Sequence, residues 1–217
     1  MPKNSILPAV PSDTPLLAQL MTDSYLPQAY MQFFFPLYPS PTHILPFYAA
    51  QISSKFEHPN TQIIKIVNES SGDIVAFTCL TKESDDKKEK LTKGNEWLNG
   101  LELKWDFVAN VVNGLDGLAE CVQGRDHFVL SLLAVHPLYQ GRSYGKQLVT
   151  YCGELADQEQ VPIFLVAFPN AYGMYLKLGY EDRLHFDVDL SEYTENYCGF
   201  GVYRSSGMVR EPKASLN

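Results

Sequence analysis

The sequence is poor in the features that mark metal sites, disulfide scaffolds and membrane proteins. Its four cysteines stand far apart, with no Cys-x-x-Cys pair and no cluster of the zinc type. We therefore expect free thiols, no metal and a reducing compartment. The apolar run 6–10 is interrupted by Pro8 and too short for a signal peptide, and no run reaches membrane-spanning length. These absences predict a cytoplasmic protein with no membrane partner.

Basic residues are also scarce, since 17 lysines and arginines face 25 aspartates and glutamates, for a net charge of −8. Nucleic-acid phosphates demand basic surfaces, so we expect no nucleic-acid partner. The same charge would attract a cationic amine. A length of 217 residues with 45% apolar residues predicts one globular domain, 1–217, with a sizeable core. The composition is compatible with a homodimer.

Hydrophobic periodicity predicts an alternation of strands and helices along the chain. A polar, mixed-charge loop is predicted at 82–94 and a helical insert at 101–123. The unit 128–168 reads as strand, helix and strand, which predicts two parallel strands. Strands are predicted at 6–10, 62–67, 74–80, 128–135, 163–168, 180–190 and 197–210. Helices are predicted after Ser12 or Asp13, and at 48–56, 145–158 and 170–178.

A glycine-containing bend joins the strand 128–135 to the helix that follows. The first turn of a helix carries unpaired N–H groups and the positive end of the macrodipole, so it favours an anion. Gly141 and Gly145 allow the backbone to approach such a ligand closely. Arg142 and Lys146 add positive charge at the same place. The bend predicts a diphosphate-bearing ligand, with an ordinary strand-to-helix connection as the alternative.

Two familiar phosphate-binding patterns do not fit this bend. The P-loop needs four residues between its glycines and a hydroxyl residue after the lysine. Here three residues separate Gly141 from Gly145, and Gln147 follows Lys146. The dinucleotide fingerprint needs Gly-x-Gly-x-x-Gly, which the bend does not contain.

Two segments resemble motifs of the GNAT superfamily of acyl-CoA-dependent N-acetyltransferases. Gln140-x-x-Ser143-x-Gly145 resembles the family's coenzyme A motif, Gln/Arg-x-x-Gly-x-Gly/Ala, with Ser143 in place of the usual glycine. The segment 172–180 resembles the family's Tyr-x-Lys-x-Gly-Phe motif. The resemblance implies an α/β (α+β) fold with a mixed central sheet of seven or so strands, flanked by helices. It further implies a V-shaped splay between the two central parallel strands.

The resemblance also implies acetyl-CoA as cosubstrate and assigns residues to it. The pantetheine arm would lie in the splay along the first parallel strand, and the diphosphate would bind at the bend. The implied cofactor-binding residues are Leu133, Ala134, Val135, Gln140, Gly141, Arg142, Ser143, Tyr144, Gly145, Lys146, Asn170 and Tyr172.

Acyl transfer to an amine needs a base or water relay, a donor for the oxyanion and an acid for the departing sulfur. By motif position, the resemblance assigns the acid to Tyr175, with Tyr172 as the fallback. It assigns the oxyanion donor to the backbone N–H of Val135. An aromatic side chain that only packs under the sheet is the alternative for Tyr175.

The general base is less well marked in the sequence. Some family members carry a glutamate on the central strand, near Val129 here, and valine cannot accept a proton. His127 enters the same strand and is the candidate base, because histidine titrates near neutral pH. Glu120 and Asp106 are weaker candidates. A structural His127 with ordered water as the relay is the alternative.

The segment 30–38 is rich in aromatic residues, and Phe33, Phe34 and Phe35 cannot all lie on one helix face. In the family this segment walls the acceptor site, so Tyr30, Phe33 and Phe34 are the candidate substrate-binding residues, with core packing as the alternative. We therefore expect transfer of an acetyl group from acetyl-CoA to the primary amine of a small molecule, by direct attack on the thioester. The alternatives are a catalytically weak CoA-binding module, a protein lysine, an N-terminus or a hydroxyl as acceptor, and an interaction protein docking through Phe33–Phe35.

Overall fold

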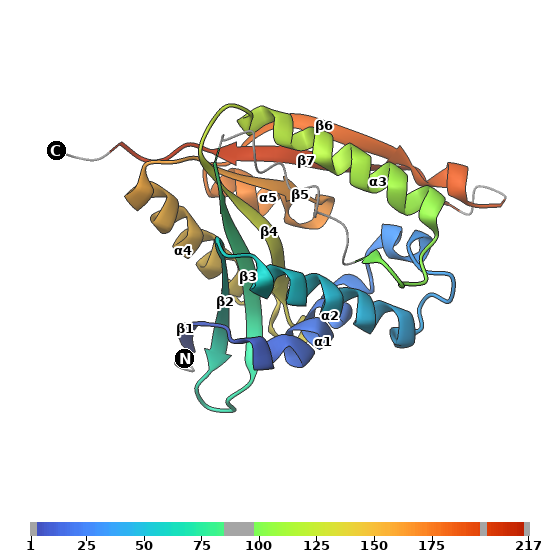
Figure 1. Ribbon diagram of the computed structural model, residues 1–217, viewed down its shortest axis with the longest axis horizontal. Helices are drawn as coiled ribbons and strands as arrows, with labels where there is room; N and C mark the ends of the chain where they lie inside the picture. Colours follow the sequence, from blue (N-terminus) through green and yellow to red (C-terminus); the bar gives the residue numbers. More distant parts are fainter. Residues whose placement is uncertain (1–3, 85–97, 196–198, 215–217) are drawn as a thin grey trace.

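The computed structural model describes residues 4–84, 98–195 and 199–214. A seven-stranded sheet with the order β1-β2-β3-β4-β5-β7-β6 forms its centre (Figure 1). Among the described strands, the central pair β4 and β5 is parallel and the other neighbours are antiparallel. The strands are β1 Asn4–Pro8, β2 Thr61–Asn68, β3 Ile74–Glu83, β4 His127–Val135, β5 Ile163–Ala167, β6 Glu181–Asp189 and β7 Val202–Arg210. The predicted mixed sheet is thereby confirmed.

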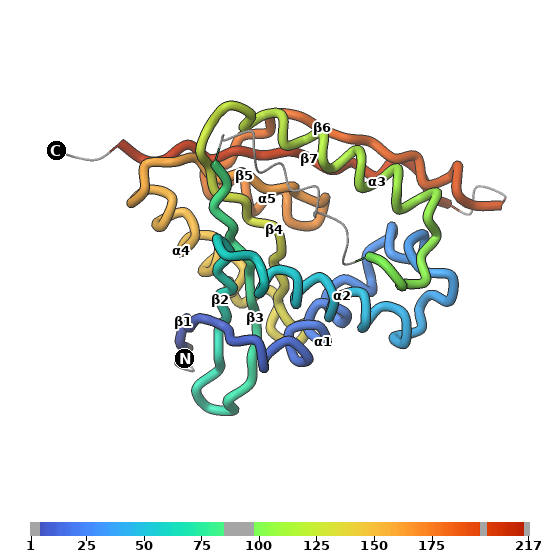
Figure 2. The backbone as a smooth tube through the Cα atoms, in the orientation of Figure 1, coloured from blue at the N-terminus to red at the C-terminus, as the bar shows by residue number. Residues whose placement is uncertain are grey.

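Helices cover both faces of the sheet (Figures 1 and 2). One apolar cluster joins α1, α2 and α3 to one face, and a second joins α4 and α5 to the other. The α-helices are α1 Thr14–Tyr25, α2 Pro41–Glu57, α3 Trp105–Gly117, α4 Tyr144–Glu159 and α5 Pro169–Lys177. Short 3₁₀ helices are η1 Pro11–Asp13, η2 Ala29–Phe33, η5 Leu118–Val122, η6 Pro137–Tyr139 and η7 Leu190–Tyr193.

The side chains of β4 switch from one face of the sheet to the other partway along the strand. Its register against β3 shifts between Cys79 and Leu80, so that Ser131 is an extra residue in β4. An extra residue moves the two-residue alternation of side chains to the opposite face. Phe128 and Leu130 therefore pack with α4 and α5, whereas the even-numbered residues beyond the bulge pack with α1 and α2.

The two central strands part soon after they meet. Their pairing runs only from Phe128–Ile163 to Leu130–Leu165, although β4 continues to Val135. Beyond that point β5 stays paired with β7 as far as Ala167. The sheet therefore opens between β4 and β5, which confirms the predicted V-shaped splay.

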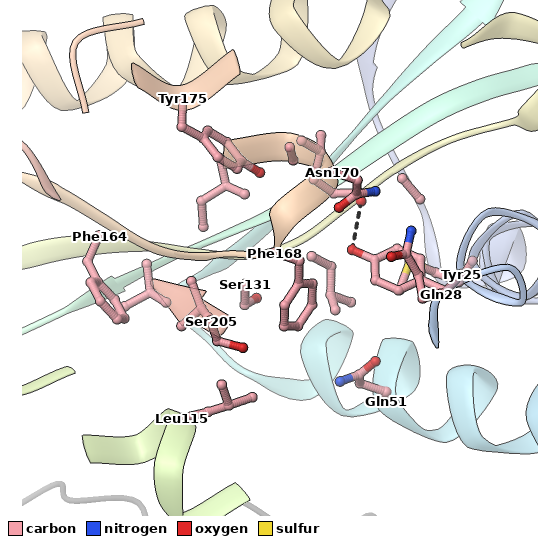
Figure 3. Close-up of a pocket in the computed structure, with 18 of the residues that line it drawn as sticks. Tyr25, Gln28, Gln51, Leu115, Ser131, Phe164, Phe168, Asn170, Tyr175 and Ser205 are labelled. Atoms are coloured by element: carbon pink, nitrogen blue, oxygen red, sulfur yellow. Dashed lines mark hydrogen bonds between the residues drawn. The ribbon is translucent and has the colours of Figure 1, made fainter. Parts of the chain in front are cut away.

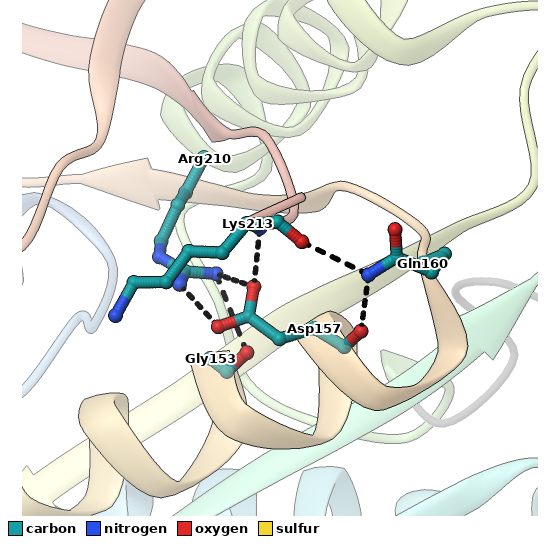
Figure 4. A network of polar contacts seen from close by, with 5 residues as sticks. All are labelled: Gly153, Asp157, Gln160, Arg210 and Lys213. Carbon is teal, nitrogen blue, oxygen red and sulfur yellow. Dashed lines mark hydrogen bonds and ion pairs between the residues drawn. The ribbon is translucent and has the colours of Figure 1, made fainter. Parts of the chain in front are cut away.

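An ion-pair network fixes α4 to the end of β7 (Figure 4). The Arg210 guanidinium donates two hydrogen bonds to the Asp157 carboxylate, at 2.9 and 2.7 Å. The backbone N–H of Lys213 donates to the same carboxylate at 2.8 Å. Burial raises the pKa of Asp157, but these hydrogen bonds outweigh it and hold the pKa below the usual value. The network positions the helix whose first turn follows the glycine bend.

The observed elements differ from the predicted ones mainly at their ends. The insert predicted at 101–123 is present as α3 and η5. Of the loop predicted at 82–94, Lys82 and Glu83 belong to β3 because they pair with β4, and 85–94 lies outside the described residues. Helix α2 begins at Pro41 rather than Tyr48, since a proline is well placed in a first turn.

The predictions from absences can be compared only with the described residues. There, Cys79, Cys121 and Cys152 are free thiols, and Cys198 lies outside the described ranges. In the same part of the chain, no helix has the length and apolar character to cross a membrane. Nor do its His, Cys, Asp and Glu side chains gather in a group able to hold a metal ion.

Candidate active site

One large cavity occupies the splay and continues along the sheet face beneath α2 and α3 (Figure 3). Its volume is about 1900 Å³. A pocket for one small ligand has typically about 300–1,000 Å³, so this cavity has room for two substrates. Of the predicted cofactor residues, those that line it are Leu133, Ala134, Val135, Gln140, Gly141, Ser143, Tyr144, Gly145, Lys146 and Asn170.

The free edge of β4 supplies backbone groups to the splay. The N–H of His136 donates to the Val75 carbonyl at 2.9 Å, so this residue faces β3. Because backbone direction alternates along a strand, Leu133 and Val135 direct their N–H and C=O groups the other way. That side is the gap, where β5 no longer pairs with β4.

Side chains at the end of α1 donate hydrogen bonds to the carbonyl oxygens of this edge. The Tyr25 hydroxyl donates to the Leu133 carbonyl at 3.1 Å. The Ser24 hydroxyl donates to the Val135 carbonyl at 2.9 Å, and the Gln140 amide donates to the same oxygen at 3.1 Å. The N–H groups of Leu133 and Val135 are thus the groups directed into the gap to serve a ligand carbonyl.

The bend between β4 and α4 has the backbone shape of an anion site. Gly141 and Ser143 both have positive φ, at 73° and 66°. Successive N–H groups in such a turn point into one concavity, and α4 begins with Tyr144 directly after it. The left-handed conformation costs a residue with a Cβ about 1–2 kcal/mol. Ser143 therefore adopts the geometry that glycine adopts more easily at this motif position.

The two basic side chains of the bend, Arg142 and Lys146, lie in different places. Gly145 lies beside β4, since a Cβ there would be in van der Waals contact with Val135 Cγ2 at 3.5 Å. Lys146 lines the cavity, whereas Arg142 does not and instead lies over the Tyr139 ring, 5.3 Å from its centroid. Lys146 is thus the cation of the bend that faces the cavity.

Tyr175 projects from α5 into the cavity (Figure 3). Its side chain is only 4% exposed, and its ring lies 5.6 Å from that of Tyr180. Burial raises the pKa of Tyr175. The hydroxyl therefore keeps its proton at neutral pH and can act as a donor to a bound ligand.

Tyr172 and His127, the other two residues predicted at the site for their titratable side chains, lie away from Tyr175 and the splay. The Tyr172 hydroxyl donates to Asp182 at 3.0 Å, and the residue does not line the cavity. His127 lines the cavity and is the first residue of β4. It lies four residues before the bulge at Ser131, a distance of about 13 Å along the strand at 3.3 Å per residue. Its Nδ1 lies 2.7 Å from the Arg125 carbonyl, and its Nε2 lies 3.7 Å from Glu83. Of Tyr172, Tyr175 and His127, Tyr175 is the one that the structure brings to the splay.

The aromatic segment contributes two of its three predicted residues to the cavity. Tyr30 and Phe34 line it, whereas Phe33 packs on Phe107 with ring centroids 5.4 Å apart. Phe33, Phe34 and Phe35 are 4%, 8% and 0% exposed. The alternative of a docking surface at Phe33–Phe35 is therefore wrong, because α2, α3 and η2 bury these rings in the core.

Several cavity residues were not predicted from the sequence. Ser24 and Tyr25 end a predicted helix, and Ser131 lies inside a predicted strand, so nothing local marks them. Gln51 carries a weak signal, because it follows Phe47 and Tyr48 at helical spacing and is thus a polar residue beside the apolar face of α2.

Comparisons with known proteins agree with this geometry. A family model described as an acetyltransferase (GNAT) domain matches residues 106–182. An uncharacterised N-acetyltransferase of Schizosaccharomyces pombe is 36% identical over 87 residues, covering 40% of this chain and 33% of that protein. The match thus spans about a third of the length of the curated relative.

Solved structures share the whole architecture. The C-terminal condensation domain of Ebony, in complex with β-alanyl-dopamine, has a TM-score of 0.71 at 11% identity, covering 97% of this chain and 100% of that one. Arylalkylamine N-acetyltransferase 2 from Aedes aegypti has a TM-score of 0.68 at 13% identity, with the same coverages, 97% and 100%. At these identities the likeness establishes the fold. Together with the splay between β4 and β5, the comparisons show that residues 106–182 are similar to a GNAT acetyltransferase domain and that the chain has the fold of that superfamily.

Proposed function

We propose that the chain transfers an acetyl group from acetyl-CoA to the primary amine of a small molecule. The observation that carries this proposal is the gap between β4 and β5, whose free edge directs the N–H groups of Leu133 and Val135 toward it. The bend between β4 and α4 and the Tyr175 side chain line the same cavity as this gap.

The extended pantetheine arm fits the gap because its amide and thioester carbonyls can accept from the strand edge. In this arrangement the diphosphate lies on the N–H groups of the bend, between Gly141 and Gly145, and Lys146 supplies a positive charge. Asn170, in the first turn of α5, is available to the pantetheine amides from the other side of the gap.

The chemical step is a direct attack of the amine on the thioester. The neutral nitrogen forms a bond to the carbonyl carbon, and the carbonyl oxygen takes up negative charge, which the Val135 N–H stabilises. When the intermediate collapses, the carbon–sulfur bond breaks and the Tyr175 hydroxyl donates to the departing sulfur. The proton lost by the nitrogen passes to cavity water, because His127 lies at the far end of β4, and water returns a proton to the Tyr175 oxygen after the thiol has formed. The products are the acetamide and free coenzyme A.

A small acceptor fits the part of the cavity that the pantetheine arm leaves free. Aromatic rings line that part, and the cavity extends from the splay under α2 and α3. The named ligand of the Ebony domain and the named substrate class of the mosquito enzyme are both built on amines with an aromatic body. These names favour a small amine over a protein tail.

The proposal is tested by mixing the purified protein with acetyl-CoA and a panel of primary amines and following free thiol. We expect thiol release with at least one amine. Loss of a general acid typically costs about 10²–10⁴-fold, so Tyr175→Phe should lower kcat at least about a hundredfold without weakening CoA binding. Tyr172→Phe, on the same helix but outside the cavity, is the control and should retain the wild-type rate.

Calorimetry with acetyl-CoA separates the alternatives. If CoA binds tightly but no amine releases thiol, the chain is a binding module rather than an enzyme. If neither acetyl-CoA nor CoA binds, the proposed function is wrong in its entirety.

A further inference from the structure

Three residues that line the cavity each carry a buried polar atom with no hydrogen-bond partner among the described residues. These atoms are Gln51 Oε1, Ser131 Oγ and the Tyr203 hydroxyl. Buried polar atoms in folded proteins almost always have a partner, either in the protein or in a bound molecule. Figure 3 shows Gln51 and Ser131 directed into the same space. These atoms therefore indicate the polar groups that an occupant must carry.

The wall around these atoms is aromatic. Tyr30 lies with its ring centroid 5.1 Å from both Phe168 and Tyr203, and 5.6 Å from Phe34. All four rings line the cavity, and Leu115 lines it from α3. Such a wall gains most from a flat apolar body, which packs against ring faces and edges.

The described residues place no carboxylate in the interior of the cavity to pair with a cation. Among the described lining residues, the carboxylates are Glu83, Asp116 and Glu120, and all three are exposed at the surface. A buried ammonium group is costly unless it is paired with a carboxylate. The interior therefore disfavours a diamine or polyamine, whose second ammonium would remain there unpaired.

Resting on the proposed function, we propose that the acceptor is a monoamine with an aromatic body that carries a neutral hydrogen-bond donor such as a phenolic hydroxyl. Gln51 is its specificity-determining residue, since Oε1 accepts the hydrogen bond of that hydroxyl. Ser131, at the bulge two residues before Leu133, lies on the strand that borders the splay and accepts an N–H of the reacting amine. One acceptor thus satisfies polar atoms contributed by α2 and β4.

The test measures binding separately from turnover, on the full chain loaded with coenzyme A. Calorimetry compares tyramine with phenethylamine, which differ by one hydroxyl, and with the diamine putrescine. We expect tyramine to bind at least about tenfold more tightly than phenethylamine, because the amine without the hydroxyl leaves Gln51 unpaired. Putrescine should bind more weakly than either.

Two substitutions at Gln51 give opposite expectations. Gln51→Leu should reduce the preference for tyramine from about tenfold to about onefold. Gln51→Glu places a carboxylate in the interior and should increase the relative affinity for putrescine, which a merely structural role would not do. Gln19→Leu, an exposed position of α1 outside the cavity, is the matched control and should keep the wild-type preference.

Each result decides the inference. Equal binding of tyramine and phenethylamine, a preference that survives in Gln51→Leu, putrescine as the tightest ligand, or no amine binding at all would overturn it. If Gln51→Leu does not fold, the inference is still tested by the ratio of the tyramine and phenethylamine affinities in the wild-type protein and by the putrescine affinity of Gln51→Glu. Selective binding without thiol release would support the inference about the acceptor site and refute the proposed acetyl transfer.

Discussion

The pair Arg210–Asp157 offers the most quantitative prediction, since the protein contains an exposed pair of the same geometry. The side chains of Arg210 and Asp157 are 9% and 20% exposed. Arg125 and Glu211 form an equally bidentate pair, at 2.9 and 2.6 Å, but are 44% and 46% exposed. The two pairs therefore differ mainly in burial.

Asp157→Ala would leave the Arg210 guanidinium buried, and the acceptor that remains in this network would be the Gly153 carbonyl, 3.3 Å away (Figure 4). Breaking a buried pair in this way costs about 3–5 kcal/mol. At roughly 2–4 °C per kcal/mol for a chain of this size, Tm should fall by about 6–20 °C. Glu211→Ala should cost under about 1 kcal/mol, because exposed pairs contribute little.

The assay is thermal unfolding of both variants and of Arg210→Met/Asp157→Ala. Because an apolar side chain needs no counter-ion, the double variant should be more stable than Asp157→Ala alone. The pKa of Asp157 is lowered in the folded state, so its contribution is present above the unfolded pKa near 4 and is lost as pH falls through the folded value. Equal Tm shifts for Asp157→Ala and Glu211→Ala would refute the reasoning from burial.

Three further predictions follow from single positions. Ser143→Gly removes the cost of a positive φ of 66° and should raise stability by up to about 1 kcal/mol, whereas an unchanged or lower Tm would contradict this. Gly114→Ala puts a Cβ 2.2 Å from the Phe186 ring and should cost about 1–3 kcal/mol in chemical denaturation. Gly117→Ala, with open space in the same helix, should be neutral or stabilising. Burial raises the pKa of Tyr175, so kcat should show no loss of this proton between pH 7 and about 10, and a Tyr175-dependent fall in that range would count against the assignment.

The strands, helices and turns that depend on residues close together in the sequence were predicted well. The run 128–135 and the bend at Gly141 were identified because strand periodicity and glycine positions depend on nearby residues alone. The helix that follows was identified for the same reason. The motif positions of Tyr175 and Gly145 then placed both residues at the cavity, where the structure has them.

The sites missed by sequence reasoning depend on contacts between distant segments. Tyr25 reaches the Leu133 carbonyl, 108 residues away, only because α1 packs across the end of β4. The bulge at Ser131 exists only in the register of β4 against β3. His127 was placed in the right strand, but its distance from the splay depends on which end of that strand opens.

The sequence by itself determined the family motifs, the succession of strands and helices, and the glycine bend that can hold a diphosphate, because each depends on local backbone preference and side-chain periodicity. Tertiary structure alone decided that β4 and β5 part beyond Leu130, and that Gln51 Oε1 and Ser131 Oγ are buried with no partner in the part of the chain that the structure describes. Strand separation and the burial of a polar atom are properties of neighbours brought together by packing, and no local pattern in the chain encodes them.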